Sequence, residues 1–152
     1  AGGNANAFKQ SKKVMNLYSK YCKRMGKSGA GQLTKMVNQI CIAGLIQSLA
    51  EGINFSEKAG LNTNEVIKVI SQGAAQSWQM QNRWKSMLND EYEHGFAVDL
   101  MRKDLSIAFN EGVKNGSNLE VAKLVDLFYS EIQDKNGGRW DTSSLLRRLQ
   151  KK

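Results

Sequence analysis

Apolar residues recur at helical spacing along almost the whole chain. Stretches with apolar side chains three or four positions apart alternate with short polar segments, and this spacing is typical of amphipathic helices. The pattern predicts helices over residues 4–18, 32–59, 63–71, 75–88, 98–113 and 118–135, followed by a last helix that Asp141 caps. The helix over 118–135 is expected to carry its apolar face on Val121, Leu124, Val125, Phe128 and Ile132. We therefore expect an all-α fold.

The helix expected over residues 32–59 is the longest, and its middle has no polar side. Residues 40–46 are apolar all round, which predicts that other helices surround this segment. The chain therefore reads as a helical bundle around one long buried helix. The uncharged run that contains this segment, residues 36–50, is shorter than the roughly 20 residues of a spanning helix. We interpret it as a core helix and expect no membrane association.

A glycine-rich joint, KSGAG at residues 27–31, is the best candidate for a domain boundary. Residues 21–25, just before it, fit either the end of the first helix or a short strand. No internal repeat accompanies this joint, so the chain reads as one main domain with a short preceding segment.

Composition narrows the kinds of site that the chain can hold. The 152 residues include two cysteines, Cys22 and Cys41, and one histidine, His94, so we expect no metal site and no histidine-based triad. We expect both cysteines to be reduced and to face the core of a cytoplasmic protein. No apolar signal segment opens the chain.

The excess of positive over negative charge is confined to the first third of the chain. The formal net charge is +8, and residues 1–50 carry eight Lys and Arg but no acidic residue. This excess indicates an anionic partner, such as nucleic acid or a phosphate-bearing cofactor, or a solvated basic face. A basic helical nucleic-acid-binding module stays an alternative, although the interleaved aromatic residues of single-strand binders are missing.

One group of residues near the start of the long helix can carry chemistry. Lys35, Asn38 and Gln39 occupy positions i, i+3 and i+4 and share a face. A lysine one turn before an apolar segment is expected to be poorly solvated, which favours its neutral amine and makes it a candidate general acid or base. Asn38 and Gln39 would supply neutral donors to the same substrate. The plain alternative is a solvated surface lysine.

Three segments resemble one enzyme family. GAGQLTKMVNQ, residues 29–39, resembles the G-x-G-x-x-x-K-x-x-N signature of the β-hydroxyacid dehydrogenases, which include 3-hydroxyisobutyrate and tartronate semialdehyde reductases. GFAVDLMRKDLSIA, residues 95–108, resembles a second block of that family, and AGGNANAF, residues 1–8, resembles its substrate loop. The similarity covers essentially the whole chain. It implies an all-helical domain over residues 29–152, preceded over residues 1–28 by the end of a Rossmann domain.

The resemblance also implies a role for each matching residue. Lys35 matches the catalytic lysine, and Asn38 and Gln39 match the polar residues that hold substrate. Lys103 matches the lysine that reaches the cofactor. Gly2 and Gly3 match the loop whose amides receive the substrate carboxylate. The implied cofactor is NAD or NADP, and the implied substrate is a small hydroxyacid or its semialdehyde. The implied assembly is a homo-oligomer formed through the helical domain.

Two departures and one absence qualify this resemblance. Gln39 stands where many members have a second Asn, and Ala1 stands where they often have a serine. The chain has no GxGxxG after a predicted strand, so it holds no pyrophosphate-binding turn. We therefore expect this chain to be part of a longer enzyme and inactive by itself. The alternative is a purely dimerising module in which Lys35 and Lys103 are ordinary surface lysines.

Overall fold

The computed structural model describes residues 1–150. Within that range 67% of the chain is helical and no strand is formed, so the expected all-α class is confirmed. The chain divides into two units, one of residues 1–38 and one that begins at Gln39. They are described separately.

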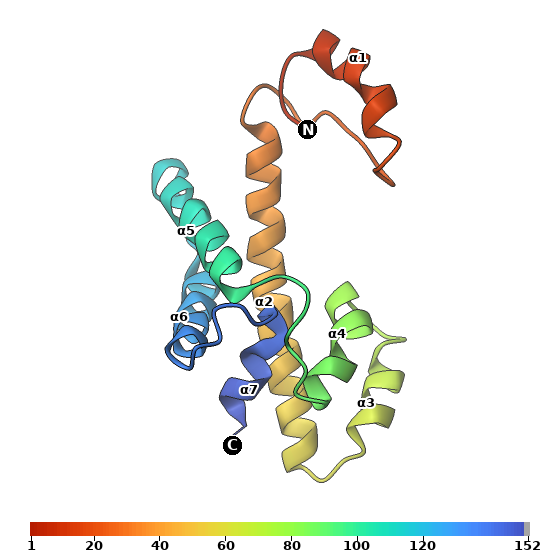
Figure 1. Cartoon of the computed structure of the whole chain (residues 1–152), viewed down its shortest axis with the longest axis vertical. Coiled ribbons are helices and arrows are strands. Elements are labelled where there is room, and N and C mark those ends of the chain that lie inside the picture. Colours follow the sequence, from red (N-terminus) through yellow and green to blue (C-terminus); the bar gives the residue numbers. More distant parts are fainter. Residues whose placement is uncertain (151–152) are drawn as a thin grey trace. The chain divides into compact units, whose positions relative to one another are not determined.

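The first unit holds one complete helix and the start of a second (Figure 1). Helix α1, Ala5–Met15, begins at Asn4, whose side chain accepts hydrogen bonds from the backbone N–H groups of Asn6 and Ala7. No residue of α1 is buried. Residues 21–25 form no strand, and an isolated parallel bridge joins Gly2 to Gly26. Helix α2, Ala30–Lys58, starts after the glycine-rich joint.

In the second unit, α2 is buried along one face. Ala43, Ile46, Ala50 and Ile53 have no exposed surface, and they recur at helical spacing. The opposite face, which we call the open stripe of α2, is exposed and consists of Cys41, Leu45, Ser48, Gly52 and Phe55. Leu45 is 44% exposed and Phe55 is 72% exposed. Within residues 39–150 the prediction that other helices surround α2 on all sides is therefore wrong. Its apolar residues lie on two faces, and only one face is covered by the core.

Two further consequences follow from this one-sided burial. Cys41 is exposed and Cys22 is half-buried, so the expectation that both cysteines face the core is wrong for Cys41, which lies on the open stripe. By length and composition alone, α2 is also apolar enough to cross a membrane. The core helix of a soluble protein can meet the same criterion, and 39% of the apolar window of α2 is buried in the structure.

The remaining helices agree closely with the predicted segments. They are α3 (Thr63–Ile70), α4 (Trp78–Leu88), α5 (Val98–Asn115), α6 (Glu120–Asp134), the short 3-10 helix η1 (Thr142–Ser144) and α7 (Leu145–Leu149). Asn62, Ser77 and Asp141 cap α3, α4 and η1 through their side chains. Helix α4 begins later than predicted because the Ser77 hydroxyl accepts the N–H of Met80.

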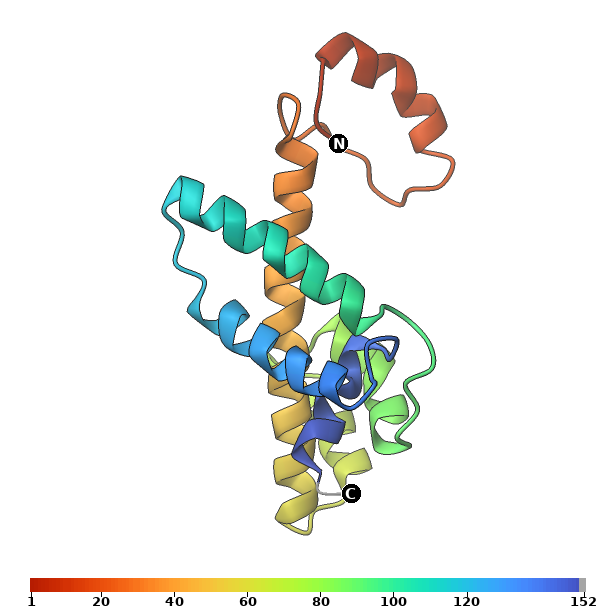
Figure 2. The same cartoon turned by 60° about the vertical axis from the view of Figure 1, so that its left-hand side comes forward.

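The core of the second unit lies where these helices meet. Helices α5 and α6 lie side by side (Figures 1 and 2). The core includes Ile46, Ile53, Ile67, Met87, Met101, Leu105, Val125, Tyr129, Ile132, Leu145 and Leu146. On α6 the buried face is Ala122, Val125, Tyr129 and Ile132. Val121 and Leu124, which were expected on that face, are 65% and 51% exposed.

Candidate active site

The amino-terminal loop packs against the first turn of α2 through two glycines. A Cβ atom on Gly2 would lie 2.8 Å from the backbone N of Gly31, and one on Gly31 would lie 2.9 Å from the N of Gly2. Neither position accepts a side chain unless the backbone moves, which explains why Gly2 and Gly31 are glycines. The Gly3 N–H donates to the Gly26 carbonyl at 3.0 Å. That bond has to open before the Gly3 amide can receive a carboxylate.

Lys35 and Asn38 lie one turn apart on α2, and both are exposed. The expectation that Lys35 is poorly solvated is therefore wrong within the first unit, where its side chain is exposed. The physical reason is that the buried stripe of α2 begins only at Gln39, one turn after Lys35. An ammonium group and a carboxamide exposed on one helix face can both reach a small polar molecule.

Gln39, by contrast, is buried and belongs to a network with α5. Its Nε2 donates to Oδ2 of Asp104 at 2.9 Å and also contacts the sulfur of Met101 at 3.8 Å. The other carboxylate oxygen of Asp104, Oδ1, lies 2.9 Å from Nζ of Lys103. The structure thus joins two of the predicted site residues, Gln39 and Lys103, through a buried aspartate. It directs the amide N–H groups of Gln39 to α5, although the sequence analysis expected them to face substrate.

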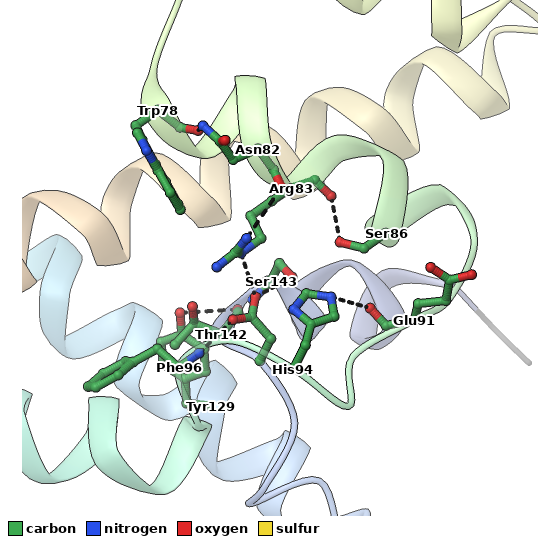
Figure 3. A network of polar contacts seen from close by, with 11 residues as sticks. Trp78, Asn82, Arg83, Ser86, Glu91, His94, Phe96, Tyr129, Thr142 and Ser143 are labelled. Carbon is green, nitrogen blue, oxygen red and sulfur yellow. Dashed lines mark hydrogen bonds and ion pairs between the residues drawn. The ribbon is translucent and has the colours of Figure 1, made fainter.

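A second buried carboxylate, Asp141, anchors the start of α5. Its Oδ2 accepts the N–H of Phe96 at 2.8 Å, and its Oδ1 accepts the N–H and the hydroxyl of Ser143. The Arg83 guanidinium of α4 lies 3.2 Å from the same carboxylate. Figure 3 shows the Arg83 side chain reaching from α4 toward Ser143, with Phe96 and Tyr129 close by. Gly95 has to be glycine here, because a Cβ would overlap the carboxylate and its φ is +74°.

Two buried tyrosines next to this network keep their protons at neutral pH. Burial raises the pKa of Tyr129 above its ordinary value of 10.0, and the neighbouring Asp141 carboxylate raises it further. Burial also raises the pKa of Tyr92, with Asp90 adding to the effect. The Tyr129 hydroxyl donates to the Thr142 carbonyl. Both rings therefore act as neutral hydrogen-bond donors.

The described residues offer one group suited to a dinucleotide and none suited to a metal. Among residues 1–150 no cluster of His, Cys, Asp or Glu could hold a metal ion. The Lys103 side chain is 58% exposed, so its ammonium group is accessible to an anionic or polar part of a cofactor. This cation fits NAD or NADP without providing a complete pocket for either.

Comparison with known sequences identifies the family. The family described as "NAD-binding of NADP-dependent 3-hydroxyisobutyrate dehydrogenase" matches residues 29–149. The chain belongs to this family. The resemblance on which the sequence analysis relied is therefore confirmed, and NAD or NADP is the cofactor class of the family.

Several proteins similar to this chain are named as oxidoreductases or dehydrogenases. An uncharacterized oxidoreductase of Shewanella frigidimarina is 59% identical, covering 99% of this chain and 52% of the relative. A probable 3-hydroxyisobutyrate dehydrogenase-like protein of Arabidopsis thaliana is 33% identical, covering 99% and 45%. The structure of Mycobacterium tuberculosis 3-hydroxyisobutyrate dehydrogenase has a TM-score of 0.88 at 22% identity, covering 99% and 54%. That likeness shows the shared fold, and the chain spans about half the length of these relatives.

The residue that sequence reasoning missed is Asp104. Its signal lay in the apolar periodicity of α5, where it falls between Met101, Leu105 and Ala108 on the face that is buried. A carboxylate on a buried face needs partners, because an isolated charge is costly away from water. That requirement makes Asp104 a candidate once the buried face of α5 is known, but it does not name Gln39 as the partner.

Proposed function

We propose that this chain is the helical part of an NAD(P)-dependent oxidoreductase that acts on a small β-hydroxyacid or its semialdehyde. The observation that carries the proposal is the family match over residues 29–149, with Lys35 and Asn38 exposed within it. Residues 1–28 are then the end of the dinucleotide-binding domain, and residues 29–152 form the helical domain. The start of the match at residue 29 supports that boundary. The two free cysteines suit a cytoplasmic location.

The proposed chemistry divides among the exposed polar groups. The nicotinamide ring accepts or supplies a hydride when it is bound. Lys35 acts as general acid and base: as a neutral amine its Nζ takes the proton of the substrate hydroxyl during oxidation, and as the resulting ammonium group it returns that proton during reduction. Asn38 hydrogen-bonds the substrate. The Gly2–Gly3 loop, close to the start of α2, holds its carboxylate, because helix amino-termini favour anions.

The remaining two predicted residues act from α5 and its contact with α2. Lys103 contacts the cofactor through its exposed ammonium group. Gln39 supports the site from the buried side through its hydrogen bond to Asp104. In this proposal the residues that contact ligands, such as Lys103, are exposed. Gln39 is buried and supports Lys103 through Asp104.

Substitution of Lys35 in the protein translated from the complete gene tests this proposal. Lys35→Ala should lower kcat for oxidation of 3-hydroxyisobutyrate by about 10²–10⁴-fold, the usual worth of general acid–base help. Lys58→Ala is the matched control, since Lys58 is an exposed lysine at the other end of α2. Activity with NAD and NADP is compared on a panel of small hydroxyacids. Near-normal kcat for Lys35→Ala would contradict the assignment.

We also propose that two copies associate through the open stripe of α2. Along the stripe, the small Ser48 and Gly52 lie between the large Leu45 and Phe55, and nothing lies within 4 Å of the Cβ position of Gly52. In an antiparallel two-fold pairing, Leu45 of one copy would pack over Gly52 of the other. Sedimentation should show a dimer that Leu45→Glu dissociates. Val113→Glu, at an exposed apolar position on α5, should leave the dimer intact, and an unaffected Leu45→Glu dimer would contradict the pairing.

A further inference from the structure

Asp104 lies at a buried position where a carboxylate destabilises the fold unless polar partners compensate for its lost hydration. Its side chain is 5% exposed, and it lies on the face of α5 that also buries Met101 and Leu105. Removing a carboxylate from water is unfavourable even after relaxation of the protein. An apolar residue would fill the same space without that cost. The two oxygens of Asp104 show what the carboxylate does instead.

Each oxygen of Asp104 holds a different residue. Oδ2 accepts the amide N–H of Gln39 at 2.9 Å, which ties α5 to α2 across 65 residues of sequence. Oδ1 lies 2.9 Å from Nζ of Lys103. Gln39 is itself buried, so it holds the carboxylate from inside the core. The hydrogen bond to Gln39 fixes the plane of the carboxylate, and the fixed carboxylate in turn sets the position of the Lys103 ammonium group.

For Lys103 this arrangement removes motion that would oppose ligand binding. A surface lysine has a rotamer entropy among the largest of any side chain, and a lysine that contacts a ligand loses it on binding. Lys103 is 58% exposed, yet its Nζ is paired with a buried anchor. The ammonium group is thus presented to solvent from a fixed point before any ligand arrives, which lowers the ordering cost of the contact.

We propose that Asp104 is a positioning residue that, together with Gln39, preorganises Lys103 for the nicotinamide cofactor. This inference rests on the proposed function, since it takes Lys103 as the cofactor contact. It adds a residue to the site and gives Gln39 a supporting role in place of substrate binding. Asp104 touches neither substrate nor cofactor in this arrangement.

The sign of one measurement separates positioning from simple charge. Asp104→Asn removes a negative charge beside the site of an anionic cofactor, so electrostatics alone would tighten cofactor binding. Positioning predicts the opposite, because Lys103 regains its rotamer freedom while asparagine still offers Gln39 an acceptor oxygen. We expect the cofactor Kd and KM of Asp104→Asn to rise about five- to tenfold. The kcat at saturating cofactor should change less.

The control and the double variant complete the test in the protein translated from the complete gene. Asp126→Asn breaks the pair that Asp126 forms with Arg102, the residue next to Lys103 on α5, and it should leave the cofactor Kd unchanged. In a Lys103→Ala background, Asp104→Asn should add no further loss of cofactor affinity, whereas a merely structural role would add one. Gln39→Met keeps the carboxylate and removes its anchor, so it should also raise the Kd severalfold, and it serves if Asp104→Asn does not fold.

The possible outcomes separate this inference from the proposed function. If Lys103→Ala raises the cofactor Kd and Asp104→Asn leaves it unchanged or lowers it, the positioning role is overturned and the proposed function stands. If Lys103→Ala has no effect on cofactor binding, the cofactor role of Lys103 fails first. NMR of the Lys103 ammonium group in this chain then tests whether Asp104 restrains it. An ammonium group equally ordered in wild type and in Asp104→Asn would overturn this anchoring.

Discussion

Removal of the Asp141 carboxylate should destabilise the second unit more than any other single truncation of a charged side chain described above. Asp141 is 1% exposed and Arg83 is 20% exposed at their side chains. Asp141→Ala therefore leaves a largely buried guanidinium without its partner, a change that typically costs about 3–5 kcal/mol. It also removes the acceptor for the N–H groups of Phe96 and Ser143. Each unsatisfied buried donor costs about 1–3 kcal/mol.

The expected loss is therefore about 4 kcal/mol or more, a large part of the roughly 5–15 kcal/mol that stabilises an ordinary domain. Asp141→Asn keeps an oxygen acceptor and loses only the charge, so it should cost about 1–3 kcal/mol. Urea unfolding followed by circular dichroism measures both values. Glu65→Gln is the control, because Glu65 pairs with Lys68 on an exposed surface of α3, where such pairs contribute under about 1 kcal/mol.

A loss below about 1 kcal/mol for Asp141→Ala would refute this reasoning. It would mean that Arg83 finds solvent or another partner at little cost. The order of the three variants is a second check, since Asp141→Asn has to fall between Asp141→Ala and the Glu65→Gln control if charge and hydrogen bonding both count.

Three further predictions follow from other contacts. Burial and Asp141 raise the pKa of Tyr129 from an ordinary value of 10.0, so above about pH 10 its proton is lost on unfolding. From pH 8 to above pH 10, the free energy of unfolding of wild type should therefore fall more steeply than that of Tyr129→Phe. An equal fall for both proteins in urea unfolding would contradict this. Gly31→Ala should destabilise the chain because its Cβ meets the N of Gly2, whereas Gly44→Ala, with nothing within 4 Å, should stabilise α2 by about 0.5–1 kcal/mol; thermal melts of the pair check the signs. A maleimide should label Cys41, which is exposed in the single chain, faster in the dissociated Leu45→Glu variant than in the dimer, and Cys41→Ser should remove this fast phase of labelling.

The helices could be predicted from sequence because their signals are local. Asp141 caps the last helical segment as predicted, since a capping side chain bonds an N–H only two or three residues away. Which apolar stripe becomes buried is not a local property. Helix α6 has two such stripes, and the one with Val125 is buried while Val121 is exposed. Periodicity alone cannot choose between them.

The candidate site divides in the same way. Lys35 and Asn38 could be predicted as site residues because a helical spacing and a family motif place them together. The Gln39–Asp104 hydrogen bond joins residues 65 apart in sequence, and nothing in either local segment names the other. The exposure of Lys35 was mispredicted for a related reason, because the apolar pattern of α2 does not say at which residue its burial begins, which is Gln39.

The Asp141 network also constrains the order in which the second unit can assemble during synthesis. Phe96 and Asp141 are 45 residues apart, and Arg83 lies earlier still in α4. At roughly 5–20 residues per second, a ribosome needs about 2–9 s to add that interval. Until then the Arg83 guanidinium lacks the carboxylate that pairs with it in the folded unit. The contacts that join Arg83, Phe96 and Ser143 through Asp141 can therefore form only after the segment that carries Asp141 has been made.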